Sequence, residues 1–194
     1  ITCVKITPYE IDNNQIAFES TIIIPLTEAK DYLIEVEKKE NTENIKTLTQ
    51  EEYIKFYGDL RKELESVLGR KLPDPKPKHF YQIPSAINGV HFEWVFYGRI
   101  NRRFYVALDF ETNDREFNKS SVEKLEMLKS KIEQETNEEV IFQKDRGNNW
   151  TRIYIMKDEG KMSEDLKEWA VKNMKIFIDI LEPEISKLSQ KIQE

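Results

Sequence analysis

The sequence predicts an α+β fold, in which an antiparallel sheet carries three main helices packed mainly on one face, with an additional N-terminal β-hairpin segment. Three observations support this prediction. Residues 90–111 alternate apolar and polar side chains on both sides of a glycine-containing turn, which is the pattern of a β-hairpin. Three other segments, which begin near residues 49, 120 and 163, repeat apolar residues at helical spacing. From Thr49 onward the expected order is α-β-β-β-α-β-β-α, which favours an antiparallel sheet with helices over one face.

Residues 1–44 are predicted to be an N-terminal β-hairpin followed by a charged connector, and residues 45–194 to be the α+β C-terminal domain. Two runs rich in β-forming residues, 1–11 and 16–24, flank the turn signal Asp12-Asn13-Asn14. The chain begins inside a strand-like pattern, so we expect this first part to be the tail end of an upstream module.

The first predicted helix begins after Thr49 and ends at Gly69. Thr49-Gln50-Glu51-Glu52 is a capping box, in which the side chains of Thr49 and Glu52 bond backbone N–H groups of the first turn. Glycine is the residue that most often follows the end of a helix. The proline-rich stretch at 72–77 is predicted to be an extended connector, because a residue before proline avoids the helical region.

The second and third predicted helices have similar start and stop signals. Ser120-Ser121-Val122-Glu123 is a second capping box, for a helix that ends near Asn137. Ser163 is expected to cap the long final helix. Pro183 lacks a backbone N–H and clashes with the preceding turn, so we expect a kink or break in that helix.

The predicted strands comprise one strand at 79–83, the hairpin at 90–111 and a second hairpin formed by 140–143 and 151–156. In the first hairpin, alternation assigns to the core side Val90, Phe92, Trp94, Phe96, Phe104, Val106, Leu108 and Phe110. The opposite side is expected to face water or a partner, and it carries His91, Glu93, Tyr97, Arg103, Tyr105, Asp109 and Glu111.

The composition limits the class of protein. The 194 residues carry a formal net charge of −6, which argues against a protein that coats DNA over its whole surface but not against a local basic patch. Cys3 is the single cysteine, so no internal disulfide can form and a cytoplasmic, reducing compartment is expected. No apolar run approaches the roughly 18 residues of a membrane span, so no membrane partner is predicted.

No catalytic residue, metal ligand or cofactor is predicted from motifs. Glu37-Lys38-Lys39, with Asp31 or Asp12 upstream, fits the Glu-X-Lys pattern of Mg²⁺-dependent nucleases, but a solvated charged connector explains it better. Asp109 and Glu111 share one side of a strand and are a second possible metal pair, although a charged strand end is the simpler interpretation. His79 and His91 have no partner at the sequence spacing of a zinc site.

Basic and aromatic residues are more informative. Between residues 76 and 106 there are five lysines and arginines and one acidic residue, and tyrosines are interleaved with them. Arginines and aromatic rings on a sheet face suit a single strand or a phosphate backbone, while the alternative is ordinary cross-strand Tyr–Arg pairing. The turns at 98–103 and 144–150 are expected to lie at one end of the sheet as a basic rim. The nucleic-acid-binding residues proposed on this basis are Arg99, Arg102, Arg103, Tyr97, Tyr105, Arg146, Trp150 and Arg152.

Several segments follow one another in the pattern and order of a known family. They are Ile1–Asp12, Ile22–Ala29, Tyr53–Leu64, Phe104–Phe110, Trp150–Ile155 and the helix around Trp169. In these segments the chain resembles an uncharacterised domain found at the C-terminus of PD-(D/E)XK restriction-endonuclease-like proteins of bacteria and archaea. The resemblance implies that the first two segments close an upstream nuclease domain whose catalytic residues would precede Ile1. No catalytic residue is therefore assigned to this chain.

The function expected from the sequence is that of a non-catalytic accessory or recognition domain in a nuclease-like, defence-related protein. Its expected partners are the upstream nuclease-like domain and, through the basic aromatic sheet face, DNA. Two alternatives stay open. One is a divalent-metal nuclease in its own right, which alone would call for Mg²⁺. The other is an oligomerisation module, in which the long C-terminal helix forms the interface of a homo-oligomer.

Overall fold

The computed structural model describes residues 3–11, 15–23, 50–98, 102–147 and 149–190. The chain separates into two compact units, Ile1–Lys46 and Thr47–Glu194. The first unit contains an antiparallel hairpin, in which β1 (Cys3–Ile11) pairs with β2 (Gln15–Ile23) as predicted. The predicted turn at residues 12–14 and the charged connector at 27–44 lie outside the described residues.

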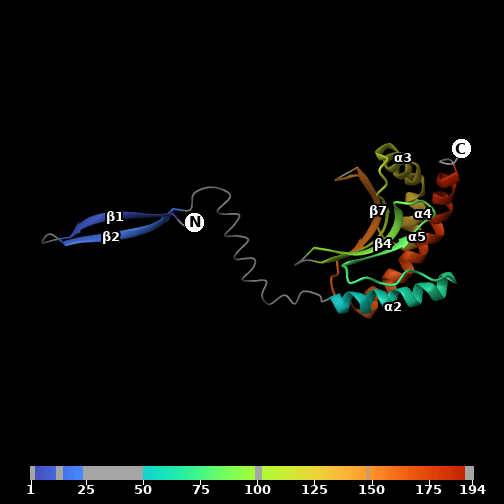
Figure 1. The fold of residues 1–194 in the computed structure, drawn as a ribbon, viewed down its shortest axis with the longest axis horizontal. Coiled ribbons are helices and arrows are strands. Elements are labelled where there is room, and N and C mark those ends of the chain that lie inside the picture. The colour runs from blue at the N-terminus through green and yellow to red at the C-terminus, as the bar shows by residue number, and fades with distance from the viewer. Residues whose placement is uncertain (1–2, 12–14, 24–49, 99–101, 148, 191–194) are drawn as a thin grey trace. The chain divides into compact units, whose positions relative to one another are not determined.

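The second unit is built on one five-stranded antiparallel sheet with the strand order β3-β4-β5-β7-β6 (Figure 1). Its strands are β3 (Phe80–Pro84), β4 (Val90–Tyr97), β5 (Arg103–Phe110), β6 (Ile141–Arg146) and β7 (Trp150–Lys157). The two predicted hairpins are thus confirmed. The second hairpin joins the first through its later strand, β7, so that β6 forms one edge of the sheet and β3 the other.

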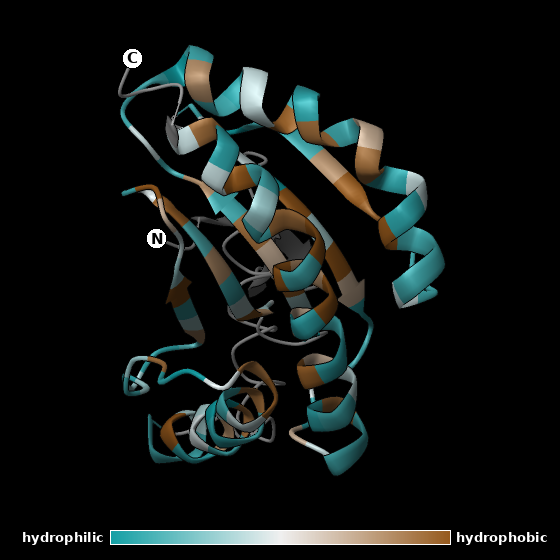
Figure 2. Cartoon of the chain, turned by 90° about the vertical axis from the view of Figure 1, so that its right-hand side faces the viewer, coloured by the Kyte–Doolittle hydropathy of each residue, from teal (hydrophilic) through white to brown (hydrophobic). Residues whose placement is uncertain are grey.

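The helices lie on one side of this sheet, which confirms the predicted α+β architecture (Figure 1). They are α2 (Gln50–Leu68), α3 (Arg115–Leu125), the 3₁₀ turn η1 (Glu126–Leu128), α4 (Lys129–Thr136) and α5 (Glu164–Gln190). Each long helix carries hydrophobic residues along one side and hydrophilic residues along the other (Figure 2). None of the described helices is both long enough and apolar enough to cross a membrane.

The core lies between the helices and the predicted apolar side of the hairpin β4–β5. All eight hairpin residues assigned to the core are buried, with exposed fractions between 0% and 3%. Aromatic rings dominate this layer: the Phe104 ring centroid lies 4.7 Å from that of Phe96 and 5.8 Å from that of Phe56 on α2. The indole N–H of Trp94 donates to the carbonyl oxygen of Ala170 on α5, which satisfies its buried polar group.

Two of the predicted helix signals are confirmed by the geometry. Gly69 follows α2 with a φ of 66°, and its N–H donates to the carbonyl oxygen of Glu65. The hydroxyl of Ser163 accepts a hydrogen bond from the N–H of Leu166, which caps the start of α5. The predicted capping box at Thr49 falls on a residue outside the described part of the chain.

The predicted start of the second helix is wrong. Helix α3 begins at Arg115, and the Asp114 carboxylate caps it by accepting the N–H of Phe117 at 2.9 Å. Ser120 lies inside the helix, where its hydroxyl donates to the carbonyl oxygen of Phe117. Aspartate and serine are equally good N-caps, so local sequence did not decide between them. The segment ends as predicted, with Asn137 in the left-handed region at a φ of 58°.

The predicted break at Pro183 does not occur, because α5 continues as one helix through this residue. Leu181 and Ile185, on the two sides of the proline, are both fully buried. Packing of both halves against the same core therefore outweighs the loss of one backbone hydrogen bond.

The predicted basic rim is also wrong, because the two turns lie at opposite ends of the sheet. Arg103, which follows the β4–β5 turn, pairs with Tyr97, whereas Phe110 at the far end of β5 pairs with Thr151 at the start of β7. The β6–β7 turn is therefore next to the end of β5. This follows from β7, and not β6, being the neighbour of β5, which sequence alternation does not reveal.

The fold predicts a large loss of stability for Phe104→Ala. Phe104 is fully buried among rings of the sheet and of α2, so truncation should lower the free energy of unfolding by about 3–5 kcal/mol. Urea denaturation followed by circular dichroism measures this change. Met127→Ala is the control, because Met127 is 85% exposed and should change stability by less than about 0.5 kcal/mol. Equal effects of the two substitutions would contradict the assigned core.

Candidate functional site

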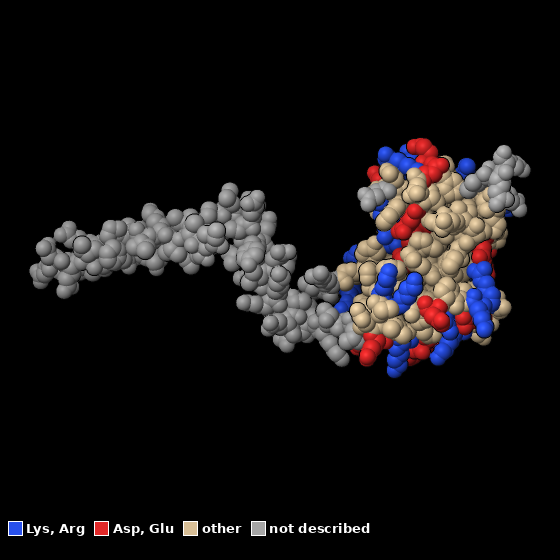
Figure 3. All heavy atoms as spheres, in the orientation of Figure 1, with Lys and Arg blue, Asp and Glu red and all other residues tan. Residues whose placement is uncertain are grey.

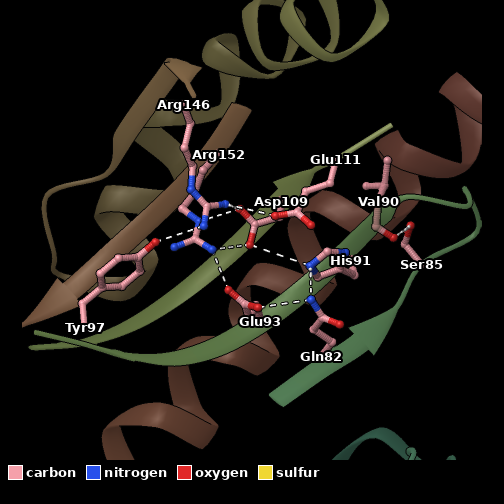
Figure 4. Close-up of polar contacts among 10 residues, drawn as sticks. All are labelled: Gln82, Ser85, Val90, His91, Glu93, Tyr97, Asp109, Glu111, Arg146 and Arg152. Atoms are coloured by element: carbon pink, nitrogen blue, oxygen red, sulfur yellow. Dashed lines mark hydrogen bonds and ion pairs between the residues drawn. The ribbon is translucent and has the colours of Figure 1, made fainter. Parts of the chain in front are cut away.

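The helix-free face of the sheet carries a group of five charged residues, which we call the carboxylate–arginine network. Glu93 lies on β4, Asp109 on β5, Glu111 directly after β5, Arg146 at the end of β6 and Arg152 on β7 (Figure 4). Three of them are buried: Asp109 is 0%, Arg152 2% and Glu93 5% exposed. Alternation assigned Glu93 and Asp109 to a face open to water or a partner, and their burial corrects that expectation.

Arg152 is the centre of this network. Its Nε donates to Asp109 Oδ1 at 2.5 Å, and its Nη2 donates to Asp109 Oδ2 and to Glu93 Oε2, each at 2.5 Å. The pair with Asp109 is bidentate, which is the strongest arrangement available to a guanidinium and a carboxylate. The neighbouring carboxylates raise the pKa of Arg152 despite its burial. Three adjacent strands are thus joined by side-chain bonds in addition to their backbone ladders.

Arg146 extends over this centre from the edge strand. Its Nη1 donates to Asp109 Oδ1 at 2.8 Å and to Glu111 Oε1 at 3.3 Å, and its Nη2 donates to the hydroxyl oxygen of Tyr97 at 3.0 Å. A side chain of β6 therefore reaches β4 across two intervening strands (Figure 4). This bridge is one physical reason why the central carboxylates are shielded from water.

Glu93 is the group in the network whose protonation is most strongly altered. Burial, followed by the negative charge of Asp109, raises the pKa of Glu93 to about 8, and the positive charge of Arg152 offsets only part of this effect. A proton on Glu93 leaves two carboxylates, Asp109 and Glu111, against two guanidiniums. The network is then electrically balanced, as a buried group of charges needs to be.

His91 and Gln82 border the network on the β3 side. Gln82 Nε2 lies 2.9 Å from His91 Nε2 and donates to Glu93 Oε1 at 3.3 Å. Because an amide NH₂ can only donate, His91 Nε2 is the acceptor, and the ring proton is on Nδ1. Burial lowers the pKa of His91, which favours this neutral form. His91 Nε2 also lies 3.8 Å from Asp109 Oδ2.

A row of three tyrosines crosses the same face, and we call Tyr97, Tyr105 and Tyr154 the tyrosine row. The ring centroids of Tyr97 and Tyr105 are 4.9 Å apart, and those of Tyr105 and Tyr154 are 5.0 Å apart. Tyr97 is 40% exposed, and the other two are partly exposed. The guanidinium of Arg152 lies 5.6 Å from the Tyr97 ring centroid, so the network supports one end of the row.

The structure brings together five of the eight predicted nucleic-acid-binding residues: Tyr97, Arg103, Tyr105, Arg146 and Arg152 lie on the helix-free face. Arg102 is adjacent to Arg103 in the chain, so its side chain is expected on the opposite face of the sheet. Its positive charge lowers the pKa of Tyr53 on α2, which places Arg102 on the side of the helices. Trp150 pairs with Arg146 at the opposite end of the sheet from Tyr97. Arg99 lies outside the described residues.

The arginines of this face differ in what they can do. Arg152 and Arg146 already bond carboxylates, so they position the network and Tyr97. Arg103 forms a salt bridge with Asp158, at 3.1 Å, in which the two side chains are 48% and 79% exposed, and it also interacts with Tyr105 of the tyrosine row. Such an exposed pair contributes little and exchanges readily with another anion.

Charges of both signs are mixed on the face of the domain that Figure 3 shows. Lysine and arginine side chains alternate with acidic ones across the view of Figure 3, with large neutral areas between them. On the described part of the chain, this view therefore displays no broad basic surface of the kind that binds duplex DNA mainly by charge.

The sequence pattern places Asp109 and Glu111 together as a possible metal pair, but it does not place His91 beside them, as the structure does. Their nitrogen and oxygen donor atoms lie within 4.8 Å of one another. The residues are distant in sequence but adjacent in space, since His91 is the cross-strand partner of Asp109. The hairpin register, which follows from pairing Tyr97 with Arg103 at the turn, would have revealed this neighbourhood.

Comparison with known proteins identifies a family for the second unit. The model of the family described as "Domain of unknown function (DUF4268)" matches residues 53–194. No curated protein and no solved structure matches the chain. The family description contains no link to restriction-endonuclease-like proteins, so that part of the resemblance stays a prediction.

The network predicts that Arg152→Met is strongly destabilising. The substitution keeps much of the side-chain volume but leaves Asp109 and Glu93 buried without their partner, which typically costs about 3–5 kcal/mol. Arg103→Met is the matched control, because its exposed bridge to Asp158 should contribute less than about 1 kcal/mol. Chemical denaturation at pH 7 compares the two variants, and a mild effect of Arg152→Met would contradict the network's role.

The raised pKa of Glu93 predicts a specific pH dependence of stability. The folded chain holds the Glu93 proton up to about pH 8, whereas a glutamate in the unfolded chain loses it near its ordinary pKa of about 4.3. Between these two pKa values the folded state binds more protons than the unfolded state. The free energy of unfolding therefore falls as the pH rises through this range.

Glu93→Gln should remove this contribution, because glutamine stays neutral and can still bond Arg152 and Asp109. We expect the variant to match the wild type near pH 4.5 and to exceed it by on the order of a few kcal/mol above pH 8. Denaturation curves from pH 4.5 to 8.5 provide the comparison. A constant difference across this range would show that Glu93 does not titrate as described.

Proposed function

The chain belongs to the DUF4268 family of domains of unknown function, and we propose that its second unit binds single-stranded nucleic acid as a non-catalytic accessory domain of a nuclease-like, defence-related protein. The observation that carries this proposal is the tyrosine row on the face of the sheet that none of the described helices covers. The upstream nuclease-like domain is a second proposed partner, and the resemblance of the sequence to restriction-endonuclease-like proteins supports it.

The tyrosine row suits unpaired bases better than duplex DNA. Every base has a flat face that stacks on an aromatic ring, and single strands expose these faces whereas duplexes do not. Three rings at successive spacings of 4.9 Å and 5.0 Å offer a continuous surface along which neighbouring bases can stack. Stacking needs no broad positive surface, which agrees with the mixed charges on the face that Figure 3 shows.

Arg103 is the proposed phosphate contact beside the row. It precedes Phe104 on β5, directly opposite Tyr97, and its partner Asp158 is highly exposed. A phosphate can replace this aspartate as the acceptor without leaving a buried charge unpaired. Arg146 and Arg152 act as positioning residues, since Arg146 bonds the hydroxyl of Tyr97 and Arg152 lies against its ring.

The two alternative functions, a divalent-metal nuclease and an oligomerisation module, require different properties of this chain. A nuclease would need the chain itself to cleave nucleic acid in the presence of Mg²⁺. An oligomerisation module would need a free apolar face, but the apolar side of α5 packs into the domain's own core at Leu166, Phe177 and Leu181. An interface on α5 would therefore have to use its polar side.

The proposal predicts salt-dependent binding of single strands that depends on the tyrosine row. Labelled oligothymidine and its RNA counterpart, titrated with the 194-residue chain at low salt, should show a rise in fluorescence anisotropy that matched duplexes do not. Tyr105→Ala and Tyr154→Ala should each weaken binding by about 1–3 kcal/mol, the contribution of one stacked base.

Tyr53→Ala is the control for these variants, because Tyr53 is a partly buried tyrosine on α2 and not on the open face. Circular dichroism confirms that each variant is folded. Failure to bind at low salt, or equal losses from Tyr53→Ala and Tyr105→Ala, would refute the proposal. Mg²⁺-dependent cleavage of the oligonucleotide by this chain would refute the non-catalytic assignment.

A further inference from the structure

We infer that His91, Asp109 and Glu111 form a binding site for a divalent first-row transition-metal ion. Antiparallel pairing places His91 of β4 directly opposite Asp109 of β5, and Glu111 lies two residues further on the same side (Figure 4). The three donor atoms are within 4.8 Å of one another, and His91 Nε2 is 3.8 Å from Asp109 Oδ2. This inference does not depend on the tyrosine row.

The donor set determines the class of ion. One imidazole nitrogen with two carboxylates suits Mn²⁺, Co²⁺ or Zn²⁺, whereas Mg²⁺ and Ca²⁺ prefer oxygen donors alone. Ligand bonds of about 2.0–2.2 Å place neighbouring donor atoms roughly 3 Å apart. The donors here are somewhat further apart, so the side chains must close around the ion by about 1 Å. Glu111, which is 23% exposed, has room to do so.

Gln82 prepares the histidine for this role. Its amide N–H points at His91 Nε2 from 2.9 Å, so this nitrogen carries a lone pair and the proton is on Nδ1. The same nitrogen is the one that lies near Asp109 Oδ2. An ion between His91 and Asp109 therefore meets an unprotonated ring nitrogen. The ion would replace the hydrogen bond from Gln82 to this nitrogen, and the Gln82 amide also donates to Glu93 Oε1.

Access to the site is from the side of His91 and Glu111. The side chain of His91 is 14% exposed, while Asp109 is fully buried beneath it. Arg152 holds Asp109 from the opposite side through both carboxylate oxygens, which fixes the orientation of the ligand as a second layer of contacts does in metal sites.

Arg146 is the competitor of the metal ion. It bonds both carboxylates of the site, Asp109 at 2.8 Å and Glu111 at 3.3 Å, and its side chain is 22% exposed. A divalent ion brings two positive charges to Asp109 and Glu111, the two carboxylates that both bond the guanidinium of Arg146. The side chain of Arg146 must therefore move outward when the ion binds, which sets a specific expectation for its removal.

The test is a titration of the full 194-residue chain, free of any affinity tag, with MnCl₂, CoCl₂ and ZnCl₂. Isothermal titration calorimetry gives the stoichiometry, and the visible absorption of bound Co²⁺ reports its coordination number and geometry. We expect one ion per chain, with MgCl₂ and CaCl₂ at least tenfold weaker. His91→Gln and Glu111→Gln should each weaken binding at least tenfold, and Arg146→Met should tighten it.

His79→Gln is the matched control, because His79 is the other histidine of the chain and lies outside this group. It should leave affinity, stoichiometry and the Co²⁺ spectrum unchanged. The inference is overturned if no saturable binding occurs up to millimolar ion. It is equally overturned if His79→Gln and His91→Gln have the same effect, or if several ions bind per chain regardless of His91.

Discussion

The bond between Arg152 and Asp109 is the interaction on which the helix-free face of the sheet depends. Both groups are almost fully buried, so removing either one leaves a buried, unpaired charge that strongly destabilises the fold. Through Arg152 the carboxylate of Glu93 joins the same centre, and through Arg146 the edge strand β6 does so as well. One guanidinium thereby joins β4, β5 and β7 on the side of the sheet where none of the described helices packs.

The two faces of the sheet are stabilised by different physics. On the helix side, rings such as Phe96 and Phe104 exclude water and lose nothing by burial. On the other side, buried charges require partners in a fixed geometry, because a buried charge without its partner is strongly destabilising. Glu93, whose proton balances the charges, shows how closely the arrangement is adjusted.

The network also divides the open face into two regions with different chemistry. The tyrosine row begins at Tyr97, at the end of β4 next to the β4–β5 turn. His91 and Glu111 lie toward the opposite end of the same hairpin. Arg146 contacts both regions, since it bonds Tyr97 on one side and Glu111 on the other. The two proposals therefore concern separate residues that share one positioning side chain, and each can fail without the other.

Most of the fold could be predicted from local patterns. Period-two alternation assigned all eight core residues of the hairpin, and the glycine and serine signals at Gly69 and Ser163 marked two helix ends. Local patterns failed where two signals were of equal strength, as with Asp114 and Ser120. They also failed where packing outweighed a local penalty, as at Pro183, which lies between the buried residues Leu181 and Ile185.

The candidate sites were less predictable, because they depend on which strands are neighbours. The sequence by itself determined that Glu93, Asp109 and Tyr97 share one side of the hairpin, since alternation is a property of each strand. Only the tertiary structure decided that β7 lies beside β5, which brings Arg152 to Asp109, buries both and separates the two turns. The physical reason is that strand order and register arise from packing over the whole domain, and no local residue pattern records them.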